Sequence, residues 1–94
     1  MTTMKALFPL GQIVATPAAL EAIEEAGQTP ADFLARHAAG DWGGVSPDDA
    51  QENELSLKEG YRLMSVYWTA KEEKLYLITE ADRSATTMLL PDEY

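Results

Sequence analysis

Hydrophobic positions along the chain follow two different spacings, and the change falls close to residue 60. Before that point, apolar residues recur every three or four positions, which is the period of an amphipathic helix. After it, they form short, nearly continuous segments rich in β-branched and aromatic side chains, which are typical of strands. The pattern therefore predicts helices in the first two thirds of the chain and strands in the last third.

Three hydroxyl–proline pairs mark the expected helix starts. A hydroxyl side chain caps the first turn of a helix, and the proline that follows needs no hydrogen-bond donor at its position. The pairs are Thr16-Pro17, Thr29-Pro30 and Ser46-Pro47. Because a glycine follows each helical pattern, the predicted helices span residues 17–26, 30–39 and 47–59.

The first two predicted helices have a clear apolar side, and the third has little of one. The apolar sides comprise Leu20 and Ile23 in the first helix, and Phe33, Leu34 and His37 in the second. The third helix offers only Ala50, Leu55 and Leu57. We expect it to lie on the surface with one shallow contact face.

Three apolar segments follow, separated by short polar turns. The first, residues 61–70, is apolar on both faces, which predicts a central strand covered on part of each side. Such short turns join only antiparallel neighbours, so residues 75–79 and 85–90 complete an antiparallel meander. A short strand at residues 12–15 would add an edge. The predicted fold is α+β, with three short helices packed on a three-stranded antiparallel meander.

The length of 94 residues predicts one domain, residues 1–94, with a flexible N-terminus over residues 1–6. The net charge is −9, and six acidic residues and one lysine give residues 41–60 a charge of −5. Phosphate backbones repel so acidic a chain, so we expect no direct contact with nucleic acid. The charge serves solubility or recognises a basic partner.

Neither a targeting segment nor a redox or metal site is visible. Pro9 and Gly11 interrupt the N-terminal apolar run too early for a signal peptide, and no run approaches the roughly 18 apolar residues of a membrane span. The chain has no cysteine and one histidine, which excludes disulfides and thiol catalysis and disfavours a transition-metal site. We predict a cytoplasmic protein with no cofactor and no membrane contact.

Two features in the middle of the chain are candidates for chemistry. His37 could act as a general base, but its four-residue spacing from Phe33 favours a half-buried structural histidine. An acidic cluster comprises Asp41, Asp48, Asp49, Glu52 and Glu54. Its glycines and acids do not follow the spacing of a calcium loop. A solvated helix face and a partner surface are the two interpretations of this cluster.

Trp42 lies among glycines in the segment GDWGG, residues 40–44. We favour a plug that fills the core where the second and third helices meet the sheet. The alternative is an exposed anchor for a partner, because tryptophan is enriched at interface hot spots. The glycines lack the following Lys-Ser/Thr of a phosphate loop.

The segment TEADRSATT, residues 79–87, combines carboxylates, a cation and hydroxyls as an active site does. A turn between two strands explains the same residues, because Asp and Ser side chains bond the local backbone. Arg83 is expected to pair with Glu80 or Asp82, or to lie across Tyr76. Any further role of Asp82 or Arg83 would be contact with a partner.

Several segments resemble a family of short proteins carried by bacterial plasmids and integrative elements. The most specific are RHAAGDWG, residues 36–43, and ITEADRSATTMLLPDEY, residues 78–94. The resemblance extends over residues 7–94 and implies a context of mobile DNA, but no catalytic residue. A restriction-modification label, which such proteins sometimes carry, finds no support here, because 94 residues cannot hold a methyltransferase.

These features predict a non-enzymatic, small acidic accessory protein of mobile genetic elements that binds a partner protein. In its sharper form, the partner is a host defence protein with a basic nucleic-acid groove, which carboxylates can occupy in place of phosphates. The predicted contact residues are Asp41, Trp42, Asp48, Asp49, Glu52, Asp82 and Arg83. Two alternatives stay open: a small-molecule binder or enzyme with a pocket near Trp42, Tyr67 and Trp68, and a structural homodimer joined along an exposed sheet edge.

Overall fold

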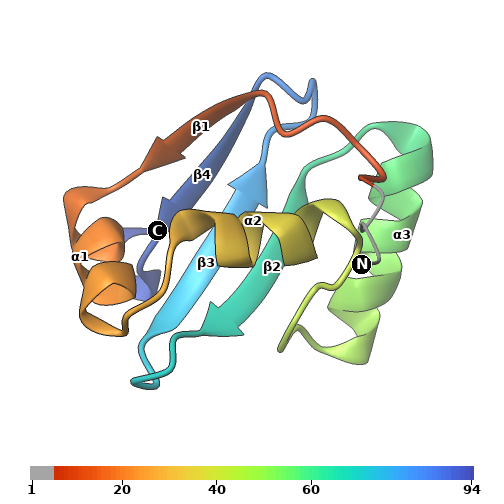
Figure 1. Ribbon diagram of the computed structural model, residues 1–94. Coiled ribbons are helices and arrows are strands. Elements are labelled where there is room, and N and C mark those ends of the chain that lie inside the picture. Colours follow the sequence, from red (N-terminus) through yellow and green to blue (C-terminus); the bar gives the residue numbers. More distant parts are fainter. Residues whose placement is uncertain (1–5) are drawn as a thin grey trace, which may run out of the picture.

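Three helices flank a four-stranded sheet within residues 6–94, the part of the chain that the computed structural model describes (Figure 1). The elements are β1 (Gln12–Ala15), α1 (Pro17–Glu25), α2 (Pro30–Ala38), α3 (Pro47–Glu59), β2 (Leu63–Trp68), β3 (Lys74–Thr79), β4 (Ala85–Leu89) and the 3-10 turn η1 (Pro91–Glu93). The α+β class is confirmed. The predicted flexible N-terminus lies outside the described residues, except for Ala6.

The hydroxyl–proline pairs begin the helices as predicted. The Thr16 hydroxyl accepts a hydrogen bond from the Ala19 N–H at 3.1 Å, which caps α1. At the start of α3, the Ser46 hydroxyl accepts from the Asp49 N–H at 3.1 Å. Residue Gly60 ends α3 in the left-handed conformation that glycine adopts most easily, with φ of 78°.

The sheet is mixed, which corrects the predicted three-stranded antiparallel meander. Its strand order is β1-β4-β3-β2. The pairs β2–β3 and β3–β4 are antiparallel, as expected from their short turns. The N-terminal strand β1 also forms, but it pairs with β4 in parallel. A parallel pair is possible there because the long connection from β1 to β4 contains all three helices and two strands.

Strand β2 is an edge strand, which corrects its predicted central position. A side chain and a loop take the place of a neighbouring strand. The Asn53 side-chain amide donates to the Met64 carbonyl at 2.8 Å and accepts from the Met64 N–H at 3.1 Å. The Val66 N–H donates to the Trp42 carbonyl at 3.1 Å, and the Gly44 N–H donates to the Val66 carbonyl at 2.7 Å. The apolar pattern of β2 therefore reflects cover from α2, α3 and this loop.

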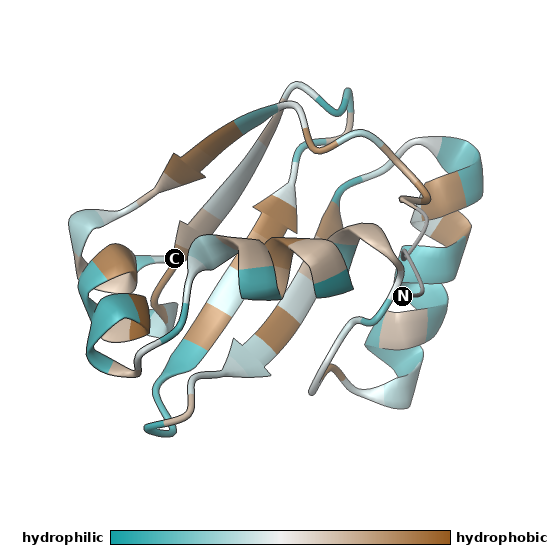
Figure 2. Cartoon of the chain, in the orientation of Figure 1, coloured by the Kyte–Doolittle hydropathy of each residue, from teal (hydrophilic) through white to brown (hydrophobic). Residues whose placement is uncertain are grey.

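Two hydrophobic clusters form the core. In the larger one, α1 and α2 pack on one face of the sheet, and Figure 2 shows hydrophobic strand residues behind α2. Its members are Ala19, Ile23, Phe33, Tyr67, Leu75, Leu77 and Met88. The smaller cluster joins Phe8, Trp42 and Leu63 beside α3. The N-terminal segment, the loop after α2 and the start of β2 meet in this second cluster.

Helix α3 docks through polar side chains more than the sequence predicts. Leu55, one of its three expected contact residues, is 47% exposed. Asn53 and Ser56 are buried instead, while Ala50 and Leu57 pack at the margin of the smaller cluster. The thin apolar pattern of this helix is sufficient because Asn53 bonds directly to the backbone of β2.

Candidate functional site

A chain of hydrogen bonds crosses the core from β2 to the N-terminal segment. At one end, His37 Nδ1 lies 2.5 Å from the Ser65 hydroxyl. On the other side of the ring, His37 Nε2 lies 2.9 Å from the Thr79 hydroxyl. The Thr79 hydroxyl is 2.7 Å from that of Thr86, and Thr86 donates to the Leu10 carbonyl at 2.7 Å. The histidine of α2 is thereby connected to three strands.

The direction of this chain follows from its last member. A carbonyl oxygen only accepts, so Thr86 gives its single hydroxyl proton to Leu10. Thr79 must then donate to Thr86, and its oxygen accepts the Nε2–H of His37. The bare Nδ1 of His37 accepts the hydroxyl proton of Ser65. His37 is therefore neutral with its proton on Nε2.

His37 is fully buried, which corrects the predicted half-buried position. Burial without a neighbouring charge lowers the pKa of its imidazole from 6.5 to about 4. The rings of Phe8 and Trp42 stand edge-on to it, with centroids 5.2 and 5.8 Å away. Both ring nitrogens are hydrogen-bonded to hydroxyl groups, so the histidine connects the strands to the N-terminal segment through hydrogen bonds.

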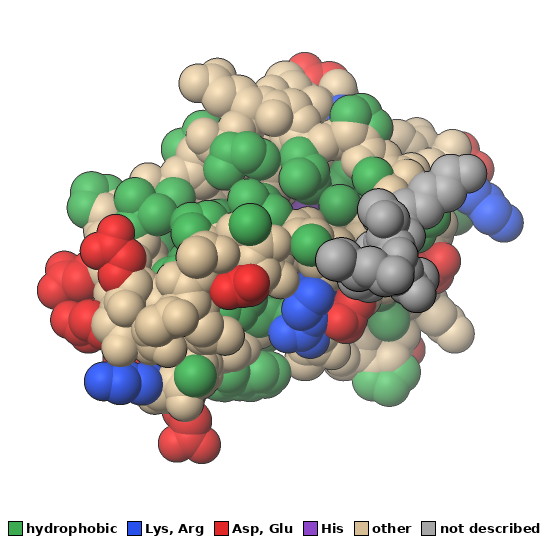
Figure 3. All heavy atoms as spheres, in the orientation of Figure 1, with side chains coloured by type: hydrophobic (Ala, Val, Ile, Leu, Met, Phe, Trp, Pro, Cys, Tyr) green, Lys and Arg blue, Asp and Glu red, His purple; other side chains and the backbone are tan. Residues whose placement is uncertain are grey.

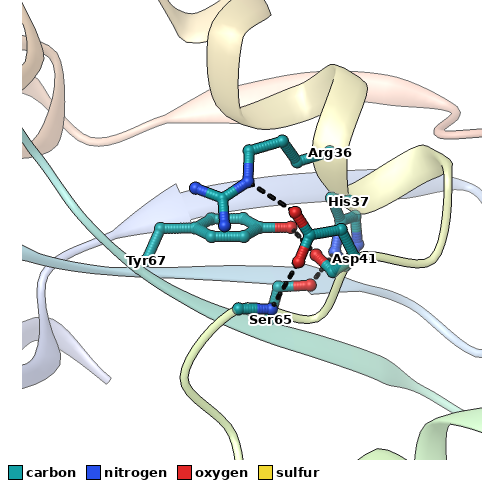
Figure 4. Close-up of polar contacts among 6 residues, drawn as sticks. Arg36, His37, Asp41, Ser65 and Tyr67 are labelled. Carbon is teal, nitrogen blue, oxygen red and sulfur yellow. Dashed lines mark hydrogen bonds and ion pairs between the residues drawn. The ribbon is translucent and has the colours of Figure 1, made fainter. Parts of the chain in front are cut away.

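Asp41, a predicted contact residue, lies beside this chain and is held by the fold (Figure 4). Arg36 Nε donates to its carboxylate at 2.7 Å, and this bond holds the pKa of the Asp41 carboxyl below its usual range. The Gly43 N–H donates to the same carboxylate at 3.2 Å. The Tyr67 hydroxyl donates to the Asp41 carbonyl, and burial raises the pKa of that hydroxyl to about 12. The Arg36 guanidinium lies over the Tyr67 ring at 4.4 Å.

A shallow pocket of about 330 Å³ opens next to this ion pair. Its lining comprises Arg36, Asp41, Gly43, Gly44, Val66, Tyr67 and Trp68. Of the three residues named for the predicted pocket, Tyr67 and Trp68 line it and Trp42 does not. Neither Trp42 nor His37 lines it, because both side chains are turned into the core.

Trp42 is 7% exposed, which confirms the plug interpretation. Its ring stacks on Phe8 with a centroid separation of 6.2 Å and an interplanar angle of 22°. The indole N–H donates to the Glu54 carboxylate at 2.8 Å and so reaches the surface of α3. A partner would find little of this side chain to contact.

Three predicted contact residues meet in one open groove of about 770 Å³. Asp48, Asp49 and Glu52 form its α3 wall, and all three are exposed. The first two also lie in the first turn of α3, where the helix dipole favours carboxylates. The remaining lining comprises Val45, Asn53, Ser56, Tyr61, Arg62, Met64, Val66 and Ala81. Acidic side chains thus stand beside an apolar floor at the outer margin of β2.

Arg83 clamps the β3–β4 turn to the end of α3, a role that the sequence reasoning missed. Its Nη1 donates to the Tyr61 carbonyl at 2.6 Å and to the Glu80 and Ala81 carbonyls at 3.2 Å each. Its Nη2 donates to the Ser56 carbonyl at 2.9 Å, near the negative end of the α3 dipole. The expected pairing of Arg83 with a carboxylate or with the Tyr76 ring is therefore corrected.

Asp82 shapes the same turn from the other side. Its carboxylate accepts the Ser84 N–H at 3.0 Å, and hydrogen bonds from Ser84 lower the pKa of the Asp82 carboxyl. The interpretation of TEADRSATT as a turn is confirmed by the paired strands on either side of it. The structure does not bring Asp82 and Arg83 into the groove lining, although Ala81 lies there.

Replacing Arg83 with alanine is expected to lower the free energy of unfolding by about 2 kcal/mol. Hydrogen bonds to charged groups contribute about 1.5–3 kcal/mol each, and the half-exposed position of Arg83 reduces their sum. Urea denaturation followed by circular dichroism measures the loss. Arg83→Lys keeps the charge without the planar fork and should recover less than half of it. Full recovery with lysine would contradict the clamp, because charge alone would then suffice.

For some of the buried polar residues, the sequence itself indicates a buried hydrogen-bond partner. Ser65 stands between Met64 and Val66 in an apolar strand, and a hydroxyl in such a place needs a buried partner. Thr79 ends the apolar run of β3 in the same way. No local signal pairs either residue with His37, because 28 and 42 positions separate them along the chain.

Comparisons with known proteins add no family and no fold relative. A scan against protein-family models, a search of curated proteins and a search of solved structures each found no match. The resemblance to proteins of mobile elements therefore stays a prediction. Among the helices of residues 6–94, none has the length and apolar character needed to cross a membrane.

Proposed function

We propose that this chain is a non-enzymatic accessory protein that binds a basic segment of a partner protein in the α3 groove. The juxtaposition of three exposed carboxylates with an apolar floor supports this proposal best. Carboxylates pair with lysine and arginine side chains, while the floor at Val45, Met64 and Val66 accepts apolar ones. The partner segment would therefore alternate basic and apolar residues.

The charge on the groove wall is available to a partner. Within residues 6–94, the ion pair that forms joins Arg36 to Asp41 and involves no groove carboxylate. Among the described residues, no cation lies within ion-pair distance of Asp48, Asp49 or Glu52, although Arg62 lines the same groove. Exposed charges of one sign attract a basic partner over roughly 8 Å at physiological salt, and this attraction weakens as salt is added.

The sharper form of the proposal identifies the partner as a cytoplasmic host defence protein that binds nucleic acid. The acidic wall would then occupy sites that hold phosphates on the partner's basic surface. The resemblance to proteins of plasmids and integrative elements supports this form, since such elements meet host defences on entry. The −5 charge of residues 41–60 supports it as well.

Neutralising the groove wall should weaken binding of a basic peptide by about ten- to a hundredfold. The variant Asp48→Asn/Asp49→Asn/Glu52→Gln removes three pairings worth about 0.5–1 kcal/mol each. A synthetic peptide of alternating lysine and leucine serves as the probe, and NMR titration gives its Kd. In the native protein, the largest shifts are expected at Met64, Val66 and Asn53.

A matched control removes the same number of charges elsewhere. Glu21, Glu24 and Glu25 are exposed on α1 and line none of the grooves described above. Their replacement by glutamine should change the Kd less than threefold. Equal losses in the two variants would show that net charge, and not the groove, attracts the peptide. A peptide of alternating glutamate and leucine should not bind either protein.

A further inference from the structure

The two edges of the sheet differ in how their backbone groups are used. At β2, Asn53 and the loop residues Trp42 and Gly44 bond to the outward-facing N–H and carbonyl groups of Met64 and Val66. At the opposite edge, β1 is the outermost strand, and no ribbon of the described residues lies beyond it in Figure 1. Proteins ordinarily block such an edge, because unpaired strand groups bind other strands.

The outward groups of β1 belong to Ile13 and Ala15. Gln12 donates its N–H to the Ser84 carbonyl at 2.9 Å, and Thr16 donates to the Met88 carbonyl at 3.0 Å. Alternate residues of a strand present their backbone groups to opposite sides, so residues 12, 14 and 16 bond to β4. The N–H and carbonyl groups of Ile13 and Ala15 consequently point away from the sheet.

The side chains of β1 carry none of the usual devices that prevent pairing. The strand QIVA contains no charged residue and no proline. Ile13 is 44% exposed on one face and Val14 is 42% exposed on the other. Figure 3 shows hydrophobic and neutral side chains along β1, with no acidic or basic group among them in this view.

We propose that β1 pairs antiparallel with the β1 of a second copy, which joins the two sheets into one of eight strands. A register centred on Val14 uses every outward group. Ile13 of each copy exchanges two hydrogen bonds with Ala15 of the other. The two Val14 residues then face each other as a non-hydrogen-bonded pair, with Cα atoms about 4.5 Å apart. Such pairs of β-branched residues stabilise sheets.

The uncharged edge lets a second copy bind there despite the negative charge of each chain, and the register centred on Val14 is self-complementary. Two chains of net charge −9 repel each other, so they associate most easily through uncharged surface. The uncharged β1 lies at one edge of the sheet, and the acidic α3 lies beyond the other edge (Figure 1). Pairing through β1 therefore places the two α3 helices at the far ends of the assembly. Both α3 grooves stay open, so this dimer does not depend on the proposed function.

Sedimentation equilibrium and hydrogen exchange test the pairing directly. The mass should rise with concentration from 10.3 kDa towards twice that value. The Ile13 and Ala15 amides should exchange more slowly as concentration increases, whereas Val14, already bonded to β4, should be protected throughout. A mass of 10.3 kDa up to millimolar concentration would overturn the proposal. So would a doubled mass without added protection of these two amides.

A pair of matched variants locates the interface. Ile13→Lys and Leu55→Lys replace side chains that are 44% and 47% exposed, and each changes the net charge from −9 to −8. The lower net charge favours association in both, so only local contact distinguishes them. Ile13→Lys should raise the dimer Kd at least tenfold, and Leu55→Lys should leave it within twofold. Equal Kd values in two variants that fold by circular dichroism would place the interface elsewhere.

Discussion

Trp42→Ala should lower the free energy of unfolding by about 3–5 kcal/mol, the range measured when a large buried aromatic side chain is removed. Trp42 is 7% exposed and connects the N-terminal Phe8 to the start of β2 at Leu63. Its loss leaves a cavity in the smaller cluster and removes the hydrogen bond to Glu54. The free energy of unfolding of a domain is typically about 5–15 kcal/mol, so this loss removes a large part of the stability. Urea denaturation followed by circular dichroism measures the change.

The second tryptophan is the natural control for this prediction. Trp68 is 48% exposed and packs over Gly44, so Trp68→Ala should cost about 1 kcal/mol. Trp42→Phe keeps most of the apolar contact and loses the N–H, and it should fall between the two alanine variants. Similar losses at positions 42 and 68 would show that Trp42 does not fill the core.

Local sequence patterns were sufficient to predict most helices and strands, but they did not predict how all the strands are arranged in the sheet. The starts of α1 and α3 follow from the hydroxyl caps Thr16 and Ser46, because capping depends on groups within the first turn. At the start of α2, the Asp32 carboxylate accepts the Thr29 N–H at 2.9 Å, and the Thr29 hydroxyl makes no capping bond. The meander follows from its short turns. The parallel pairing of β1 with β4 depends on contacts between residues that are more than 70 positions apart in the sequence, and no local pattern encodes such contacts.

The misplaced strand shows why burial alone does not identify a central position. Residues 61–70 are apolar on both faces, and that pattern is shared by a strand between neighbours and by one that is covered otherwise. Here Asn53 supplies the missing neighbour at Met64, and Gly44 approaches Val66 closely. An asparagine in an acidic helix gives no sign of such a contact in the sequence.

The residues of the candidate groove likewise include some that the sequence could predict and some that it could not. The acidic residues of α3 were predictable as a group, because 48, 49 and 52 fall close together on one helix. Their apolar floor was not, since Met64 and Val66 come from a strand whose position was predicted wrongly. Arg83 binds backbone carbonyls, which carry no sequence identity, and so no charged partner could have been inferred for it.

Lowering the pH from 7 to 4 should reduce the free energy of unfolding by about 3 kcal/mol through His37 alone. Burial lowers the pKa of its imidazole to about 4 in the folded chain, against 6.5 when unfolded. Between these values the unfolded chain binds the additional proton, so stability falls as pH falls. A gap of about 2.5 pH units corresponds to about 3 kcal/mol at 1.36 kcal/mol per unit. Well below pH 4 both states are protonated at this residue, and its contribution stays constant.

Burial is the main reason for this dependence, and the fixed direction of the hydrogen-bond chain opposes protonation of His37 as well. A proton on Nδ1 of His37 would face the hydroxyl of Ser65, which now donates to that nitrogen. Ser65 would have to rotate its proton away and become an acceptor inside the core, next to an uncompensated positive charge. The bonds from Nε2 through Thr79 and Thr86 to Leu10 would not reverse, because the carbonyl at their end cannot donate.

The single histidine makes the measurement specific. As the pH is lowered from 7 to 4.5, the urea midpoint of unfolding should decline in the native protein. It should stay nearly level in His37→Gln, whose side chain cannot be protonated in this range. The carboxyls with lowered pKa values, Asp41, Asp82 and Glu93, lose most of their stabilising contribution below this window, and the native protein and His37→Gln share that loss. An NMR titration of the folded protein should show the imidazole still neutral at pH 5. A titration near 6.5, or an unchanged decline in His37→Gln, would contradict the buried neutral histidine.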